Sequence, residues 1–286
     1  MNQPPRKSGE VSAIEGNFMN RFIVFTIATL LLGCANSQST QSGSLGVTRK
    51  QYIAVNPAEL SQQSQKLYAQ EIQKAHTQGK LNNNPKIYKR VQTITHKLIP
   101  QTAIFRPEAG QWKWEINVVE SNEPNAYCLP GGKIIVYSGL ITQLKATDGE
   151  LAAVIGHEIA HALRDHAAER ISVSQRNQTI AGIGAALLGS QTGYDFSNIA
   201  NLGTNLFFNL PNNREQESEA DRVGLELMAR AAYDPNEAIS LWKKMIADGD
   251  KSSSWMSTHP SGTQRIADLQ ALVPIAMPLY QKAMHK

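Results

Sequence analysis

The sequence has 286 residues, of which 41% are hydrophobic and 18% are charged, and its formal net charge is +4. This composition is apolar enough to build a core and argues against a disordered chain. Long runs of Lys or Arg are absent from the sequence, so nucleic acid is not expected as a partner. The two cysteines, Cys34 and Cys128, are too few for a disulfide-stapled mini-protein or a cysteine-rich zinc module.

The N-terminal residues have the features of an export signal. Residues 22–32 form an uncharged, mostly apolar run after Arg21, which suits a signal peptide and is too short to span a bilayer unaided. The run ends in Gly33-Cys34, which resembles the attachment site of bacterial lipoproteins. This resemblance implies that residues 1–33 are an N-terminal extension and signal peptide and that Cys34 is lipidated. An ordinary signal peptide with an incidental cysteine is the alternative interpretation.

The segment after Cys34 is expected to be a flexible tether. Residues 35–48 are uncharged and rich in Ser, Gln and Gly, so residues 34–56 are predicted to link a lipid to a domain over residues 57–286. Residue 35 is Ala rather than Asp. By the lipoprotein resemblance, this favours a bacterial periplasmic protein anchored to the outer membrane.

The remaining sequence predicts an α+β domain that is mostly helical and has a small sheet. Helices are expected at about residues 57–79, 85–98, 148–164, 165–188, 213–230, 235–248 and 261–272. Strands are expected at residues 112–120 and 134–137, with a loop over residues 122–132. Residues 189–212 are rich in Gly and Asn and are expected to be irregular, which suggests a lid or plug over a cleft.

A metal-binding pattern lies inside the predicted helix at 148–164. His157 and His161 are four residues apart, so both imidazoles lie on one helix face and can reach one metal ion. Glu158 follows His157 directly, so it lies near the metal but not on the helix face that holds the two ligands. A carboxylate in this place can deprotonate an attacking water. The alternative is a pair of histidines on an exposed helix face.

The predicted helix at 213–230 offers a third ligand. Glu217 and Asp221 share one helix face, so Glu217 could complete a site of two His and one Glu, which is typical of catalytic zinc. Asp221 could then accept a hydrogen bond from a ligand imidazole. An acidic cluster on a helix is more commonly a solvated face, and Glu215 and Glu219 are interpreted in that way.

Four motifs together resemble the M48-type metallopeptidases. These are HEIAH at 157–161, ESEAD at 217–221, NAYCLPGGKIIVYSGLI at 125–141 and THPSGTQRI at 258–266. The resemblance covers about residues 57–272 and implies a zincin-like (gluzincin) domain with one zinc ion per chain. The small bacterial lipoproteins and the mitochondrial members are the most similar branches, and the tetratricopeptide repeats of longer members are not expected.

The resemblance also implies roles for individual residues. His157, His161 and Glu217 match zinc ligands, Glu158 matches the general base, and Asp221 matches the carboxylate behind a ligand. For His259 it implies either stabilisation of the oxyanion or a fourth ligand in a closed state, with Arg265 accompanying it. A further set matches a strand edge that pairs with extended substrate: Asn125, Ala126 and Tyr127.

The function implied is zinc-dependent hydrolysis of peptide bonds in misfolded or unassembled envelope proteins. A lipid anchor in the membrane and the outer-membrane assembly machinery are the other expected partners. One alternative is a metal-bound holdase that grips such proteins without cutting them. Others are a non-protease hydrolase of the deformylase kind, which the sequence around Cys128 disfavours, and a structural lipoprotein with a relic site.

Overall fold

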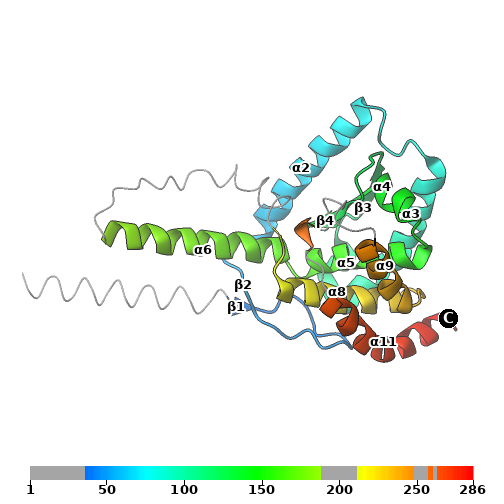
Figure 1. Ribbon diagram of the computed structural model, residues 1–286. Coiled ribbons are helices and arrows are strands. Elements are labelled where there is room, and N and C mark those ends of the chain that lie inside the picture. The colour runs from blue at the N-terminus through cyan, green and yellow to red at the C-terminus, as the bar shows by residue number, and fades with distance from the viewer. Residues whose placement is uncertain (1–35, 188–210, 248–256, 260–262, 286) are drawn as a thin grey trace, which may run out of the picture.

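A computed structural model describes residues 36–187, 211–247, 257–259 and 263–285 (Figure 1). The expected signal peptide, Cys34 and residues 189–210 of the Gly/Asn-rich stretch at 189–212 lie outside these residues. Within them the chain is mostly helical with two small sheets, as expected for the α+β class. In this part of the chain, no helix is both long enough and apolar enough to cross a membrane.

The elements follow one another in a simple order. The helices are α2 (Pro57–Thr77), α3 (Pro85–Leu98), α4 (Ser138–Gln143), α5 (Asp148–Leu163), α6 (His166–Leu187), α8 (Arg214–Arg230), α9 (Asn236–Ala247) and α11 (Thr263–Met284), with 3₁₀ turns η1 (Ile99–Ile104) and η2 (Pro107–Gln111). The strands are β1 (Asn36–Ser37), β2 (Gln51–Tyr52), β3 (Glu115–Val119), β4 (Ala126–Leu129) and β5 (Lys133–Tyr137).

The helix starts follow from local capping chemistry. Asn56 caps α2 and Asn84 caps α3, and each is followed by a proline at the first helical position. Thr147 and Glu150 form the expected capping box at the start of α5. These side chains satisfy backbone N–H groups that the first helical turn leaves without partners.

The end of the last helix differs from the prediction. The sequence predicts a stop near residue 272, but α11 continues through Pro274 and Pro278 to Met284. Prolines remove backbone donors and usually end or kink a helix. Here the additional turns keep apolar contacts, since Ala276 is buried and Leu279 packs against the core.

The main sheet has the order β3-β5-β4, in which β5 is parallel to β3 and antiparallel to β4. The expected loop at 122–132 is therefore wrong for residues 126–129, which form the edge strand β4. Of the residues that suggest a loop, Pro124 precedes this strand, and Pro130, Gly131 and Gly132 belong to the turn after it. Gly131 and Gly132 have φ values of +86° and +81°, which glycine adopts without steric cost, and they return the chain into β5.

The segment before α2 is not the flexible tether that its composition suggests. Leu45 and Val47 are buried in the main core, and the Ser44 and Leu45 amides donate to Glu226 Oε2 at 2.7 and 3.1 Å. The guanidinium of Arg49 forms ion pairs with Glu169 and Glu219 at 2.5 and 2.6 Å. A few apolar and charged residues among many small polar ones are enough to fix this segment against the domain.

Helix α5 is the central element of the fold. All its residues from Gly149 to Leu163 are buried, and it packs on α8, α9, α3 and the edge strand β4. Two glycines let α5 and α8 approach closely. A Cβ at Gly224 would lie 2.8 Å from the backbone nitrogen of His157, and one at Gly156 would lie 3.0 Å from the carbonyl oxygen of Gly224. Residues on facing sides of these helices can therefore share one site.

Gly224→Ala should force α8 away from α5. Overpacking of this kind costs about 1–3 kcal/mol, and the better helix propensity of Ala offsets at most about 1 kcal/mol. We expect a lower free energy of unfolding by denaturant titration and weaker zinc binding. Gly110→Ala is the control, since its Cβ would meet only the Ala103 methyl at 3.9 Å. Wild-type stability and zinc binding in Gly224→Ala would show that the close approach is dispensable.

Candidate metal centre

Four side chains from three parts of the chain converge in the interior of the fold, where α5 packs against α8. His157 and His161 come from α5, Glu217 comes from α8 and His259 comes from the segment 257–259; all four are buried. Their ligand atoms lie within 4.8 Å of one another. The i, i+4 spacing of the histidines and the close packing of α5 on α8 produce this convergence.

The separations between these atoms fit one tetrahedral metal ion. His161 Nε2 lies 3.0 Å from His157 Nε2 and 3.3 Å from Glu217 Oε1. His259 Nδ1 lies 3.2 Å from His157 Nε2 and 2.9 Å from Glu217 Oε1. Zinc bonds of about 2.0–2.1 Å place tetrahedral ligand atoms roughly 3.3 Å apart. Three imidazoles and one carboxylate are also a donor set that zinc prefers.

The protonation of the cluster is set by burial and by charge. Burial and Arg265 oppose a charge on His157, but Glu217 and Asp221 outweigh them and raise its pKa to about 9. Burial lowers the pKa of His161 well below its ordinary value. Burial disfavours an ionised Glu217, yet the charges of His259 and His157 hold its pKa well below the usual range. The site therefore retains an anionic ligand in the fold's interior.

Asp221 and Arg265 contact members of the cluster without belonging to it. Asp221 Oδ1 lies 3.1 Å from His157 Nδ1, as expected for a carboxylate that orients a ligand imidazole. Arg265, from α11, donates to Asp221 Oδ2 at 2.6 Å and to Glu217 Oε2 at 2.5 Å. Its guanidinium also lies 3.7 Å from the centre of the Trp242 ring. Arg265 thus contacts the carboxylates instead of facing the cleft.

Glu158 lies next to the cluster but is not one of its four members. It is buried, and its Oε1 lies 3.5 Å from Nε2 of His259. It shares a cavity with His161, His259 and Asn212 on one side and with residues 125–130 on the other. Its place beside the ligand atoms and inside this cavity suits a group that moves a proton at the reacting centre.

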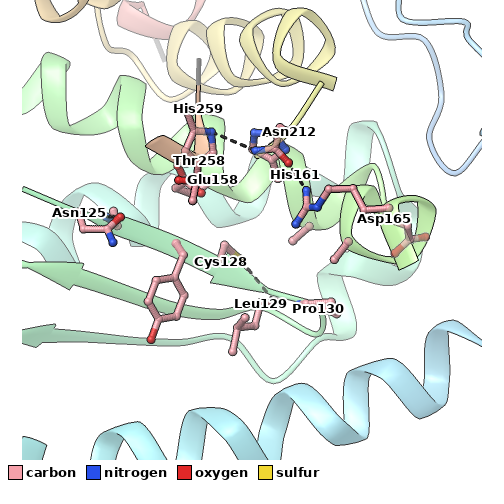
Figure 2. A pocket seen from close by; sticks show the side chains of 15 residues that line it. Asn125, Cys128, Leu129, Pro130, Glu158, His161, Asp165, Asn212, Thr258 and His259 are labelled. Carbon is pink, nitrogen blue, oxygen red and sulfur yellow. Dashed lines mark hydrogen bonds and ion pairs between the residues drawn. The ribbon is translucent and has the colours of Figure 1, made fainter. Parts of the chain in front are cut away.

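The edge strand β4 forms the opposite wall of the cavity (Figure 2). One edge of β4 pairs with β5, while Asn125, Ala126 and Tyr127 line the cavity. The ring of Tyr127 packs near Tyr137, with centroids 6.2 Å apart, on the far side of the sheet. The tyrosine ring therefore belongs to the hydrophobic cluster that β4 shares with Tyr68 of α2.

Cys128 lies in the same wall without joining the cluster. Its side chain is buried, and burial raises the pKa of its thiol well above the ordinary value. A protonated thiol is a poor ligand and a poor nucleophile. Cys128 is not one of the four clustered side chains among the described residues.

Several residues around the site carried no clear signal in the sequence. Asn212 donates its backbone N–H to Thr258 at 2.9 Å, and its amide lies 3.2 Å from His259 Nδ1, so it fixes the segment 257–259 (Figure 2). The interpretation of Glu219 as a solvated residue is wrong. Glu219 is buried and accepts hydrogen bonds from Arg164 and His166 at 2.9 and 3.0 Å. Helical periodicity places Glu219 on a different face from Glu217, but only the fold shows that this face is also covered.

Comparison with known proteins agrees with this site. Residues 85–273 match Peptidase family M48. The mitochondrial metalloendopeptidase OMA1 of Schizosaccharomyces pombe is 40% identical over 168 residues, covering 57% of this chain and 48% of that protein. The metalloprotease LoiP of Escherichia coli is 27% identical over 244 residues, covering 85% of this chain and 92% of that protein.

A longer relative matches a smaller part of this chain. The beta-barrel assembly-enhancing protease of Escherichia coli is 28% identical over 160 residues, covering 53% of this chain and 32% of that protein. The chain spans about half the length of the two fungal OMA1 proteins that it matches. The family match covers most of the described fold and includes His157, His161, Glu217 and His259. The chain therefore belongs to Peptidase family M48.

Proposed function

We propose that the protein is a zinc-dependent metalloendopeptidase. The observation that carries this proposal is the position of Glu158 beside a buried cluster of three imidazoles and one carboxylate, facing a strand edge across a small cavity. Relatives named as metalloendopeptidases and metalloproteases support it. His157, His161 and Glu217 would hold the zinc ion.

The residues of the chain have separate tasks in this mechanism. Zinc, when bound, supplies a Lewis acid that polarises the scissile carbonyl and acidifies water. Glu158 takes the proton from the attacking water and delivers it to the leaving amine. Asp221 and Arg265 keep His157 and Glu217 in place. The open edge of β4 pairs with an extended substrate segment, a mode of peptide binding that needs no particular side chain.

We further propose a location and a substrate class. The apolar run at 22–32 followed by Cys34 supports a lipoprotein anchored to a bacterial outer membrane. Misfolded or unassembled envelope proteins, including outer-membrane proteins, are then the substrates within reach. Backbone pairing at β4 suits this class, since unfolded chains share a backbone and differ in side chains.

A holdase is the second candidate function, and one observation favours it. His259 places Nδ1 among the ligand atoms, 2.9 Å from Glu217 Oε1, and Asn212 fixes its segment there. A fourth protein ligand fills the position that a catalytic zinc leaves open. In this closed arrangement the chain would hold unfolded clients at β4 without cleaving them.

Glu158→Gln should abolish cleavage of unfolded casein and leave zinc content unchanged. The amide keeps the size of the side chain but cannot accept the proton, and general-base catalysis contributes about 10²–10⁴-fold. The wild type and a chelator-treated sample are assayed in parallel. Cleavage by Glu158→Gln at the wild-type rate would exclude Glu158 as the base. Failure of the wild type to cleave while binding both zinc and casein would favour the holdase.

Glu217→Ala should lose most bound zinc, measured as metal content after dialysis against a weak chelator. The change removes the one carboxylate in the cluster and one of the two carboxylates that pair with Arg265. Glu215→Ala is the matched control, because Glu215 is exposed on the same helix. Retention of full zinc content in Glu217→Ala would show that the third ligand is a different residue.

His259→Ala should retain zinc and cleave casein faster than the wild type. Removal of the fourth imidazole leaves three protein ligands and an open position. Cleavage is measured at saturating zinc. A fall of about 10²–10³-fold in kcat would instead indicate that His259 stabilises the oxyanion.

A further inference from the structure

A buried relay of side chains lies behind the ligand His161 and is not part of the cleft. His161 Nδ1 lies 2.7 Å from His166 Nδ1, and His166 Nε2 lies 3.0 Å from Glu219 Oε2. All three side chains are buried, and His166 is fully enclosed. We propose that His166 is a positioning residue that fixes the tautomer and orientation of His161, and that Arg49 of the N-terminal segment supports it through Glu219.

The donor and acceptor of each hydrogen bond in the relay follow from Glu219, the residue at its far end. Glu219 lies between the guanidinium groups of Arg164 and Arg49, at 2.9 and 2.6 Å, so it is a carboxylate that can only accept. Nε2 of His166 must therefore donate to Glu219. Neutral His166 then has a lone pair on Nδ1, which accepts the N–H at Nδ1 of His161.

This arrangement prepares His161 for a metal ion. An imidazole with its proton on Nδ1 has its lone pair on Nε2. Nε2 of His161 is the atom that faces His157 Nε2 and Glu217 Oε1, at 3.0 and 3.3 Å. His157 receives the same support from Asp221, so each metal-facing imidazole of α5 has its own partner on α8, directly or through His166.

The N-terminal segment closes the far end of the relay. Arg49 donates to Glu219 Oε1 and Glu169 Oε1, and Gln51 donates to the backbone oxygen of Arg164 at 2.5 Å. Glu169 and Glu219 are both buried, and two carboxylates with Arg164 alone would leave an uncompensated buried charge. Residues 49–51, which precede the main helical domain, therefore contribute to the zinc site without contacting it.

A second Arg–Glu pair, Arg230 with Glu226, also contacts the N-terminal segment. Arg230 pairs with the buried Glu226 at 2.7 Å, and Glu226 binds the amides of Ser44 and Leu45 in the same N-terminal segment. Among the described residues, Glu226 forms its hydrogen bonds and ion pair with Ser44, Leu45 and Arg230 and none with the four clustered side chains. Arg49 and Arg230 thus both hold the segment, but only Arg49 is connected to His161.

The decisive measurement is the zinc Kd of the full-length chain by competition with a chromogenic chelator. It rests on the proposed zinc site but not on cleavage, so it is informative even if the protein does not cut casein. His166→Phe should raise the zinc Kd by about 10–100-fold, the usual effect of losing such a partner. His166→Gln, which keeps an acceptor and a donor, should recover part of this loss. His96→Phe, an exposed histidine, is the control.

The Arg49 branch is tested with a matched pair of variants. Arg49→Met should raise the zinc Kd several-fold, while Arg230→Met should leave it unchanged, with circular dichroism to confirm that both are folded. A wild-type zinc Kd in folded His166→Phe would overturn the relay. If His166→Phe does not fold, wild-type affinity in both His166→Gln and Arg49→Met would overturn it. An equal rise in the zinc Kd of Arg49→Met and Arg230→Met would show that only attachment of the N-terminal segment matters. That result would overturn the role of Arg49 in the relay.

Discussion

The close approach of α5 and α8 is the constraint on which the site depends. Gly156 and Gly224 leave room for backbone contact where side chains normally separate two helices. As a result, the two histidines of one helix and the two carboxylates of the other face each other at hydrogen-bonding distance. A wider separation would take Glu217 and Asp221 out of reach of His161 and His157, and the loss of partners is costly for a buried charged group.

Mutual pairing makes this concentration of buried charge tolerable. Arg265 binds both carboxylates of α8, Arg164 and Arg49 bind Glu219, and each imidazole has a partner for its second nitrogen. Buried ion pairs of this kind add little to stability on balance, yet loss of one partner is severe. Their value here is geometric, because they hold the ligand atoms at separations that a metal ion requires.

Short-range signals made much of this architecture predictable. The helix starts at Pro57, Pro85 and Asp148 follow from caps and prolines in the sequence, and the spacing of His157 and His161 needs only a helix. The strand β4 has no clear signal in the sequence, because its four residues lie among prolines and glycines and its pairing with β5 is a tertiary contact. The sequence predicts α11 too short for a related reason, since tertiary packing keeps the helix going past Pro274 and Pro278.

The remaining misses depend on partners that are distant in sequence. Glu219 is separated from His166 by 53 residues and from Arg49 by 170, so no periodicity connects them. Similarly, Asn212 meets His259 across 47 residues. The composition of residues 35–48 indicates a flexible linker, and only the fold reveals the apolar surface that receives Leu45 and Val47.

The cavity brings Glu158, the cluster of four potential metal ligands and the edge strand β4 together, and His259 is one of those four side chains. The central claim is that one zinc ion in this cluster makes the protein a peptidase. Zinc titration of the chelator-stripped protein, with casein cleavage followed at each addition, tests it most directly. The account predicts that cleavage recovers in proportion to zinc and reaches its plateau at one ion per chain. Full cleavage without zinc, or none at full occupancy in either the wild type or His259→Ala, would contradict it.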